Sequence, residues 1–125
     1  MILDTNALSG WLDDDPKVRA LLREAVVIAL SPIVLGEYRF GILASRFRAE
    51  YEQQLRKIEH DLPPLLLDGA TAVHYAELRR LLRRSGRPIP WHDLWIAAQA
   101  RQHRMPVLSR DTHFDVVPGI IRIGW

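Results

Sequence analysis

Short runs of apolar, strand-forming residues alternate along this chain with segments of helical spacing. The runs lie at residues 1–3, 25–30, 65–67, 106–108 and 120–123. Strands separated by helices pair in parallel, because each helical crossover returns the chain to the end of the sheet where the previous strand began. The alternation therefore predicts an α/β fold in which helices cover both faces of a parallel sheet.

Two helices are predicted to begin at a capping residue followed by proline, at Asp15-Pro16 and at Ser31-Pro32. The capping side chain accepts a hydrogen bond from a free backbone N–H, and proline at the first helical position has no N–H to satisfy. Residues 32–60 form a segment longer than a usual globular helix. We expect two helices there, meeting near Ser45 or Arg46.

Two more helices are expected in the second half of the chain. Asp68 precedes a helix that runs to about Ser85, and Pro88 and Pro90 delimit the approach to another at residues 91–103. The chain has 125 residues, of which 48% are hydrophobic and 26% charged, with no repeat or low-complexity tract. These values are typical of one globular domain, so we predict a single domain over residues 1–125.

The composition also excludes some chemistry and suggests a compartment. The chain has no cysteine, which excludes disulfides, thiolate metal sites and a cysteine nucleophile. Its first residues, MILDTN, place an acid where a secretory signal carries basic residues, and no apolar run is long enough to cross a bilayer. We expect a cytoplasmic protein without a membrane partner.

The net charge of +2 is too small to predict a nucleic-acid partner by itself. One cluster of basic residues stands out, which we call the arginine strip. It consists of Arg79, Arg80, Arg83, Arg84 and Arg87. Two interpretations are open: contact with RNA phosphates, or a solvated helix face paired with nearby acids.

Two acids follow predicted strands. Asp4 comes directly after the first apolar run, and Asp111 comes three residues after Leu108. Ligands of an open parallel sheet bind outside the carboxyl ends of its strands. Both carboxylates could therefore face one crevice, although either could instead accept loop amides, as aspartates commonly do.

Two other acids share a helix face with apolar residues. Glu37 lies three or four positions from Ile33 and Phe40, and Asp93 lies three positions from Ile96. A carboxylate on an apolar face is costly unless something neutralises it. The structural alternatives are a buried arginine partner for Glu37 and a favourable helix dipole for Asp93.

Four converging carboxylates repel one another unless a cation lies among them. An all-oxygen site suits Mg²⁺ or Mn²⁺, which also bind phosphates, and the chemistry that this arrangement favours is phosphodiester hydrolysis with one or two ions. The predicted catalytic and metal-binding set is Asp4, Glu37, Asp93 and Asp111. Arg110, next to Asp111, is the best candidate for a substrate contact near the metal.

Other polar and aromatic residues are weaker candidates for the site. The acidic run 13–15 precedes Pro16, so helix capping explains it better than a metal site. His92 and His113 flank two of the acids and could contribute hydrogen bonds there, but surface positions are the safer expectation. Trp91 and Trp95 lie one turn apart and predict core or interface packing.

Four stretches resemble the motifs of PIN-domain nucleases, and among them the toxin of VapC-type, type II toxin–antitoxin pairs. They are MILDTNALS, SPIVLGEYRFGI, IPWHDLWIAAQA and MPVLSRDTHFDVVPGIIRI, and they span almost the whole chain. No single motif is very specific, but their order and spacing together are.

The resemblance implies a PIN-like three-layer sandwich with a five-stranded parallel sheet, and cleavage of RNA by Mg²⁺ or Mn²⁺ held by the four acids. It also implies a homodimer and inhibition by a cognate antitoxin. By the same match, Asn6 and Ser109 orient an acid or a water, and Ser109 stands where many family members carry threonine.

Two other functions compete with this interpretation. A receiver-like, Mg²⁺-binding signalling domain shares the length and the alternating pattern, and Asp68 is near the position of its phosphoacceptor. Receivers need a lysine at the end of the last strand, however, and the two lysines here, Lys17 and Lys57, fall in predicted helices. The second alternative is a catalytically silent PIN fold that acts as a binding module.

Overall fold

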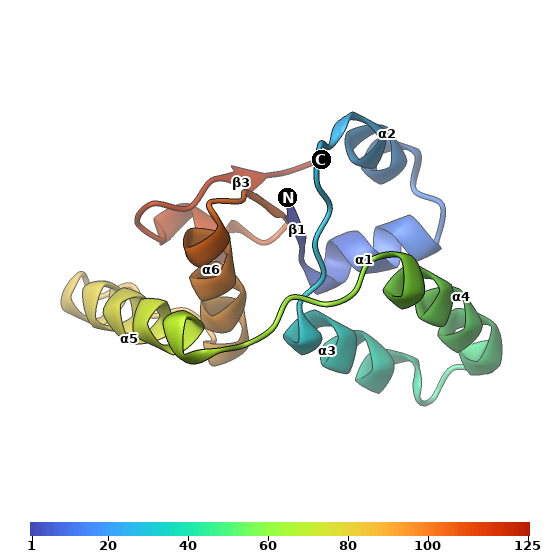
Figure 1. Ribbon diagram of the computed structural model, residues 1–125, viewed down its shortest axis with the longest axis horizontal. Helices are drawn as coiled ribbons and strands as arrows, with labels where there is room; N and C mark the ends of the chain where they lie inside the picture. Colours follow the sequence, from blue (N-terminus) through green and yellow to red (C-terminus); the bar gives the residue numbers. More distant parts are fainter.

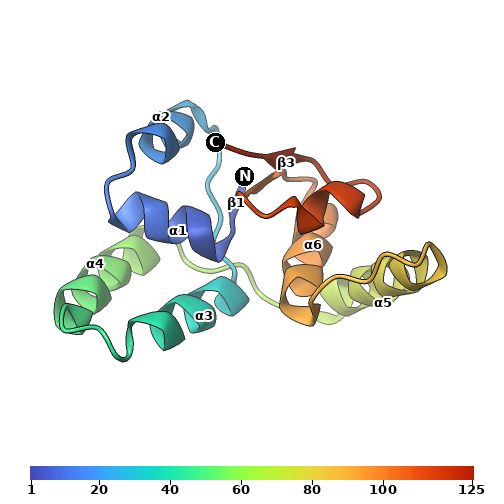
Figure 2. The same cartoon turned by 180° about the vertical axis from the view of Figure 1, so that it is seen from behind.

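The structure is a computed structural model that describes all residues 1–125 (Figure 1). Its elements follow the order β1 (Ile2–Leu3), α1 (Thr5–Leu12), α2 (Pro16–Glu24), α3 (Pro32–Ile42), α4 (Arg48–Asp61), α5 (Gly69–Arg84), α6 (Trp91–His103), β2 (Val107–Leu108), the 3-10 helix η1 (Thr112–Val116) and β3 (Arg122–Ile123). Helices α1 to α4 gather on one side of β1, and α5 and α6 lie on the other, as the two opposite views show (Figures 1 and 2). No helix has the length and apolar character needed to cross a membrane.

The three strands form a parallel sheet in the order β1-β2-β3. Ile2 aligns with Val107, and Val107 aligns with Arg122. All four residues of β1 and β2 are fully buried. The predicted α/β fold with a parallel sheet and flanking helices is confirmed.

Only three of the five expected strands form. Residues 25–30 contribute an isolated bridge between Ala29 and Ile2, and residues 65–67 contribute one hydrogen bond, from Leu65 N to Leu30 O at 2.9 Å. Val26, which is 99% exposed, lies outside the sheet. Pro63 and Pro64 precede Leu65 and have no N–H to donate to a strand ladder.

The predicted helix starts agree with the structure. Asp15 accepts hydrogen bonds from the first backbone N–H groups of α2, Ser31 caps α3, and Asp68 forms a capping box at the start of α5. The break expected near Ser45 separates α3 from α4.

One helix, α1, was not predicted, because Asn6, Ser9 and Gly10 are weak helix formers. Gly10 is required by packing: a Cβ atom there would lie 2.9 Å from Val18 Cγ2 of α2. Glycine inside a helix suggests close approach of another backbone, but at Gly36 and Gly41 of α3 a Cβ atom would have no neighbour within 4 Å. The close approach in this fold is therefore between α1 and α2.

Candidate active site

The four predicted acids are positioned by four different elements. Asp4 follows β1 and is the N-cap of α1, and Asp111 follows β2 and is the N-cap of η1. Glu37 lies in the middle of α3, and Asp93 lies in the first turn of α6. Because β1 and β2 are parallel neighbours, their carboxyl ends place Asp4 and Asp111 at the same edge of the sheet.

The Asp4 side chain is buried, and three hydrogen-bond donors surround its carboxylate. It is 5% exposed. Its carboxylate accepts hydrogen bonds from Ser109 Oγ at 2.6 Å, Asn6 Nδ2 at 2.8 Å and Thr5 N at 2.7 Å. These bonds fix the orientation of the carboxylate and place Asn6 and Ser109 beside it.

Asn6 and Ser109 also tie the ends of β1 and β2 together. Asn6 Nδ2 donates to Ser109 Oγ at 3.2 Å, and Asn6 Oδ1 accepts from the backbone N–H of Arg110 at 3.0 Å. Ser109 Oγ accepts from the backbone N–H of Asp111 at 2.9 Å. Two short polar side chains thereby connect Asp4 and the backbone that carries Asp111.

Burial raises the pKa of the Asp4 carboxyl above its usual value, because the charged form loses water. Its hydrogen bonds from Ser109 and Thr5 oppose that rise, and the like charges of Glu37 and Asp111 add to it. The pKa of Asp93, which is 4% exposed, is also raised, first by burial and further by the charges of Asp4 and Asp111. The carboxylates are therefore close enough to repel one another.

Glu37 is more accessible, and Thr5 orients it. Thr5 Oγ1 donates a hydrogen bond of 2.7 Å to Glu37 Oε2. Thr5 was not predicted as part of the site. The signal was present in the sequence, since Thr5 directly follows Asp4 and precedes Asn6 in the LDTN stretch.

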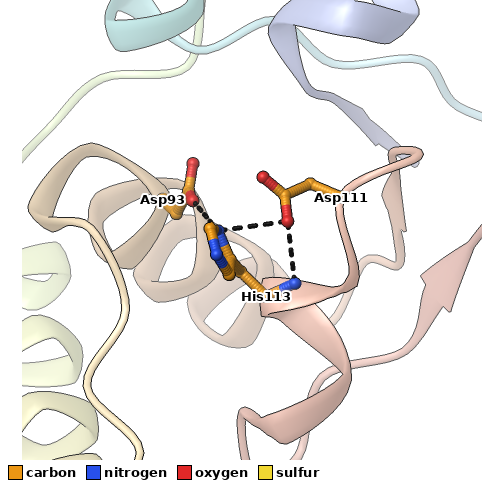
Figure 3. Close-up of side chains that lie close together, drawn as sticks. All are labelled: Asp93, Asp111 and His113. Carbon is orange, nitrogen blue, oxygen red and sulfur yellow. Dashed lines mark hydrogen bonds and ion pairs between the residues drawn. The ribbon is translucent and has the colours of Figure 1, made fainter.

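Two histidines lie among the acids rather than on a remote surface. His113 Nδ1 is 3.1 Å from both Asp93 Oδ2 and Asp111 Oδ1, and Figure 3 shows its ring between the two carboxylates. His92 Nε2 is 3.5 Å from Glu37 Oε1 and 3.6 Å from Asp93 Oδ1. Both expectations for these residues agree with the structure: the histidines contact the acids, and their side chains are 34% and 50% exposed.

Arg110 lies beside the site, and its side chain is occupied by other groups. Its guanidinium is 3.0 Å from Asp15 Oδ2 and lies over the ring of Trp125, 4.7 Å from the centroid. These residues line a cleft of about 770 Å³ that also includes Asn6. A substrate contact by Arg110 stays a prediction.

The donor set fits a hard divalent cation. No lysine or arginine lies within ion-pair distance of any of the four acids, and the two histidines are the only basic side chains that do. Ligand atoms of Asp93, Asp111 and His113 lie within 4.8 Å of one another. Clustered carboxylates, two of them buried with raised pKa values, need positive charge, and oxygen donors are those that Mg²⁺ and Mn²⁺ prefer.

The fold and the site together define a class: α/β proteins that gather carboxylates beyond the carboxyl end of a parallel sheet, an arrangement suited to metal-assisted phosphodiester chemistry. Residues 1–120 match the model of the PIN domain family. The chain belongs to the PIN-domain family.

Within that family, the chain is similar to toxins and ribonucleases of the VapC type. Ribonuclease VapC5 of Mycobacterium tuberculosis is 35% identical over 120 residues, covering 94% of this chain and 87% of that protein. Toxin FitB of Neisseria gonorrhoeae is 30% identical over 122 residues, covering 90% and 88%. The crystal structure of VapBC2 from Rickettsia felis, bound to a DNA fragment from its promoter, contains a chain with a TM-score of 0.85 at 26% identity, covering 99% of this chain and 97% of that one.

Proposed function

We propose that this protein is a metal-dependent endoribonuclease that hydrolyses RNA phosphodiesters. The observation that carries the proposal is the convergence of four carboxylates, none of which forms an ion pair with a lysine or an arginine. Relatives at 35% and 29% identity are named ribonucleases, which supports RNA as the substrate class.

In this proposal Asp4, Glu37, Asp93 and Asp111 hold one or two ions of Mg²⁺ or Mn²⁺. When bound, the metal supplies Lewis-acid activation of a water and of the phosphate. The protein's own contribution is to fix the donors in place before substrate arrives.

Three short polar side chains do this positioning. Ser109 and Asn6 hold the Asp4 carboxylate through hydrogen bonds of 2.6 and 2.8 Å, and Thr5 holds Glu37 through one of 2.7 Å. Such outer partners keep metal-binding side chains in one orientation. Arg110 is proposed to contact substrate beside Asp111, which requires its side chain to leave Asp15.

We further propose that the ribonuclease is the toxin of a type II toxin–antitoxin pair. One relative is named a toxin, and a solved structural neighbour is a VapBC complex bound to promoter DNA. The proposed partners are a cognate antitoxin protein and a second copy of this chain, in the cytoplasm. Phe40 is 79% exposed and Leu43 51% exposed, so α3 ends in apolar surface that a partner could cover.

The receiver-like alternative is not supported. Asp68, its candidate phosphoacceptor, caps α5 by accepting hydrogen bonds from Thr71 N at 3.0 Å and Gln102 Nε2 at 3.0 Å. Its carboxylate is therefore occupied by a structural role. The catalytically silent binding module is an outcome of the test below.

The test is cleavage of a mixed-sequence RNA by the purified protein in Mn²⁺ or Mg²⁺, with EDTA and Asp4→Asn as negative samples. Asp61→Asn is a matched control, because Asp61 is an exposed acid at the end of α4, away from the four acids. We expect cleavage by the wild type and by Asp61→Asn only. Equal cleavage in all samples would indicate contamination, and no cleavage would favour the binding module.

The toxin assignment has a separate test. Expression of the chain alone should arrest growth, and co-expression with a short open reading frame immediately upstream of its gene should relieve the arrest. Growth at the normal rate without that partner would contradict the toxin assignment while leaving the nuclease proposal intact.

A further inference from the structure

The arginine strip has no acidic partner. Six other arginines of the chain form ion pairs with aspartate or glutamate, whereas none of the five in the strip does so. Residues 78–92 contain no acid, and the nearest acid of α5, Glu77, pairs with Arg101 at 2.9 Å. Of the two interpretations left open by the sequence, pairing with nearby acids is therefore the wrong one.

The position of the strip at the end of α5 explains only some of its arginines. Arg83 and Arg84 lie in the last turn, where positive charge favours the helix dipole. Arg79 lies more than a turn earlier, and Arg87 lies beyond the helix. Since the whole chain carries only +2, the remainder is net acidic, and the strip is a local concentration of positive charge.

A groove of about 330 Å³ runs beside the strip, between α5, the following loop and the start of α6. We call it the α5–α6 groove. Arg79 and Arg83 line it from α5, Ile89 from the loop, and Trp91 and Leu94 from α6. Trp91 is 64% exposed, which leaves a large aromatic surface open beside two guanidinium groups that have no acidic partner.

The groove adjoins the candidate active site through two neighbouring residues at the start of α6. Trp91 directly precedes His92, whose ring is edge-on to the indole at 5.8 Å between centroids. His92 Nε2 in turn is 3.5 Å from Glu37 Oε1. The start of α6 lies between α5 and α3 (Figure 1), so an RNA bound at the acids can extend along this end of α6 toward the groove.

We propose that the α5–α6 groove holds single-stranded RNA next to the bond that is cut, with a base stacked on Trp91 and phosphates on Arg79 and Arg83. This inference rests on the proposed ribonuclease function. Four carboxylates repel a polyanion, so the site needs positive charge nearby to retain its substrate. Unpaired bases stack on aromatic side chains without regard to sequence, and arginine binds phosphate with two N–H groups.

The test is fluorescence anisotropy of a fluorescein-labelled, mixed-sequence, single-stranded RNA in EDTA, where no cleavage occurs. The double variant Arg79→Gln/Arg83→Gln should bind the RNA about tenfold more weakly. The association constant K decreases as salt rises, and the magnitude of the slope of log K against log salt should decrease by about 0.7 for each arginine removed. Trp91→Ala should bind about fivefold more weakly or worse, and Trp91→Phe should recover most of that loss.

The matched control is Arg23→Gln/Arg48→Gln, which removes two exposed arginines without ion pairs from α2 and α4. It should change neither the affinity nor the slope beyond the effect of net charge. All variants should melt close to the wild-type temperature, because the substituted side chains are exposed and the helix-dipole contribution of a single arginine is small.

Two results would overturn the inference. Equal losses in the strip variant and in the control would mean that only net charge matters. Conversion of a dimer to a monomer by Arg79→Gln/Arg83→Gln, with RNA affinity unchanged, would make the strip a protein interface. A wild type that neither binds nor cuts RNA would instead refute the ribonuclease proposal itself, which separates the two failures.

Discussion

Ser109 is fully buried, and its hydroxyl joins three groups of the site. It donates to Asp4 and accepts from Asn6 and from the backbone N–H of Asp111. We expect Ser109→Ala to lower the single-turnover cleavage rate by about 10- to 100-fold, because outer partners of this kind orient the metal-binding groups. The unpaired neighbours should also lower the free energy of unfolding by about 1–3 kcal/mol.

Ser109→Thr separates positioning from general destabilisation. Threonine keeps the hydroxyl, so this variant should retain most of the cleavage rate even where its extra methyl group costs stability. Rates and urea unfolding curves of both variants check the prediction. A wild-type cleavage rate in Ser109→Ala would contradict the proposed role of Ser109 in positioning the metal-binding acids.

Asp93 should make the metal-free protein less stable as the pH rises. Its pKa in the folded protein lies above 3.8, chiefly because of burial. A carboxyl with a raised folded-state pKa favours the folded state when protonated, and that contribution is lost as the pH rises from 3.8 through the folded pKa. The amide of Asp93→Asn carries no charge and has no such loss.

We therefore expect the melting temperature of Asp93→Asn, measured in EDTA, to exceed that of the wild type by more at pH 7 than at pH 4. Saturating Mn²⁺ should reverse the order, since only the wild type gains the full binding energy. A difference between the two proteins that is the same at both pH values would show that repulsion at Asp93 does not cost stability.

The four acids could be predicted from sequence, because two follow strands and two lie on apolar helix faces. His113 could not be placed among them, since its position depends on the turn of η1, which begins at the Asp111 cap. Thr5 was missed for a related reason: the sequence places it beside Asp4, but without helix α1 its contact with Glu37 of α3 could not be predicted. The spacing of residues along the chain identifies the candidate acids, but only the tertiary structure shows which other side chains contact them.

At the scale of elements, Arg39 joins α3 to α4. Its guanidinium donates to Glu59 at 2.7 and 2.8 Å and to Glu52 at 3.1 Å. The hydrogen bonds from Arg39 hold the pKa of Glu59 below its usual value. Arg39→Gln should therefore lower the free energy of unfolding at pH 7 by about 1–3 kcal/mol, allowing for the partial exposure of the pair.

The direction of the Glu59 pKa shift predicts how the stability difference between wild type and Arg39→Gln changes with pH. A depressed folded-state pKa contributes stability above the unfolded value of 4.5, and that stability is lost as the pH falls through the folded value. The gap between wild type and Arg39→Gln should thus shrink in acid. Arg56→Gln is the matched control: its side chain is 75% exposed and pairs with Glu52 at 3.4 Å, so it should cost less than about 1 kcal/mol. Equal losses in the two variants would contradict the account.

Helices were easier to predict than strands in this chain. A cap and a proline mark the starts of α2 and α3 locally, and the observed N-caps are Asp15 and Ser31. The strands have only two residues each, so composition marks where the chain is buried but not which backbone groups pair. Residues 65–67 have the composition of a strand, yet the ladder stops after one hydrogen bond.

At the scale of the whole molecule, the acids outside the site show what distinguishes it. Asp13, Asp14 and Asp15 form the densest acidic run in the sequence, but each has a partner of its own. Tyr51 donates to Asp13, Arg19 pairs with Asp14, and Arg110 pairs with Asp15. The four acids of the candidate site come from distant parts of the chain, and no lysine or arginine lies within ion-pair distance of them. A divalent cation should therefore bind among the four acids in preference to the acidic run 13–15.

The most direct test is an anomalous difference map from crystals of the protein soaked in Mn²⁺. We predict one or two peaks within coordination distance of the carboxylates of Asp4, Glu37, Asp93 and Asp111, and none at the acidic run 13–15. Asp4→Asn crystals treated in the same way should show weaker peaks or none. A peak at the acidic run, or no peak among the four carboxylates at saturating Mn²⁺, would contradict the claim that these acids form a metal centre.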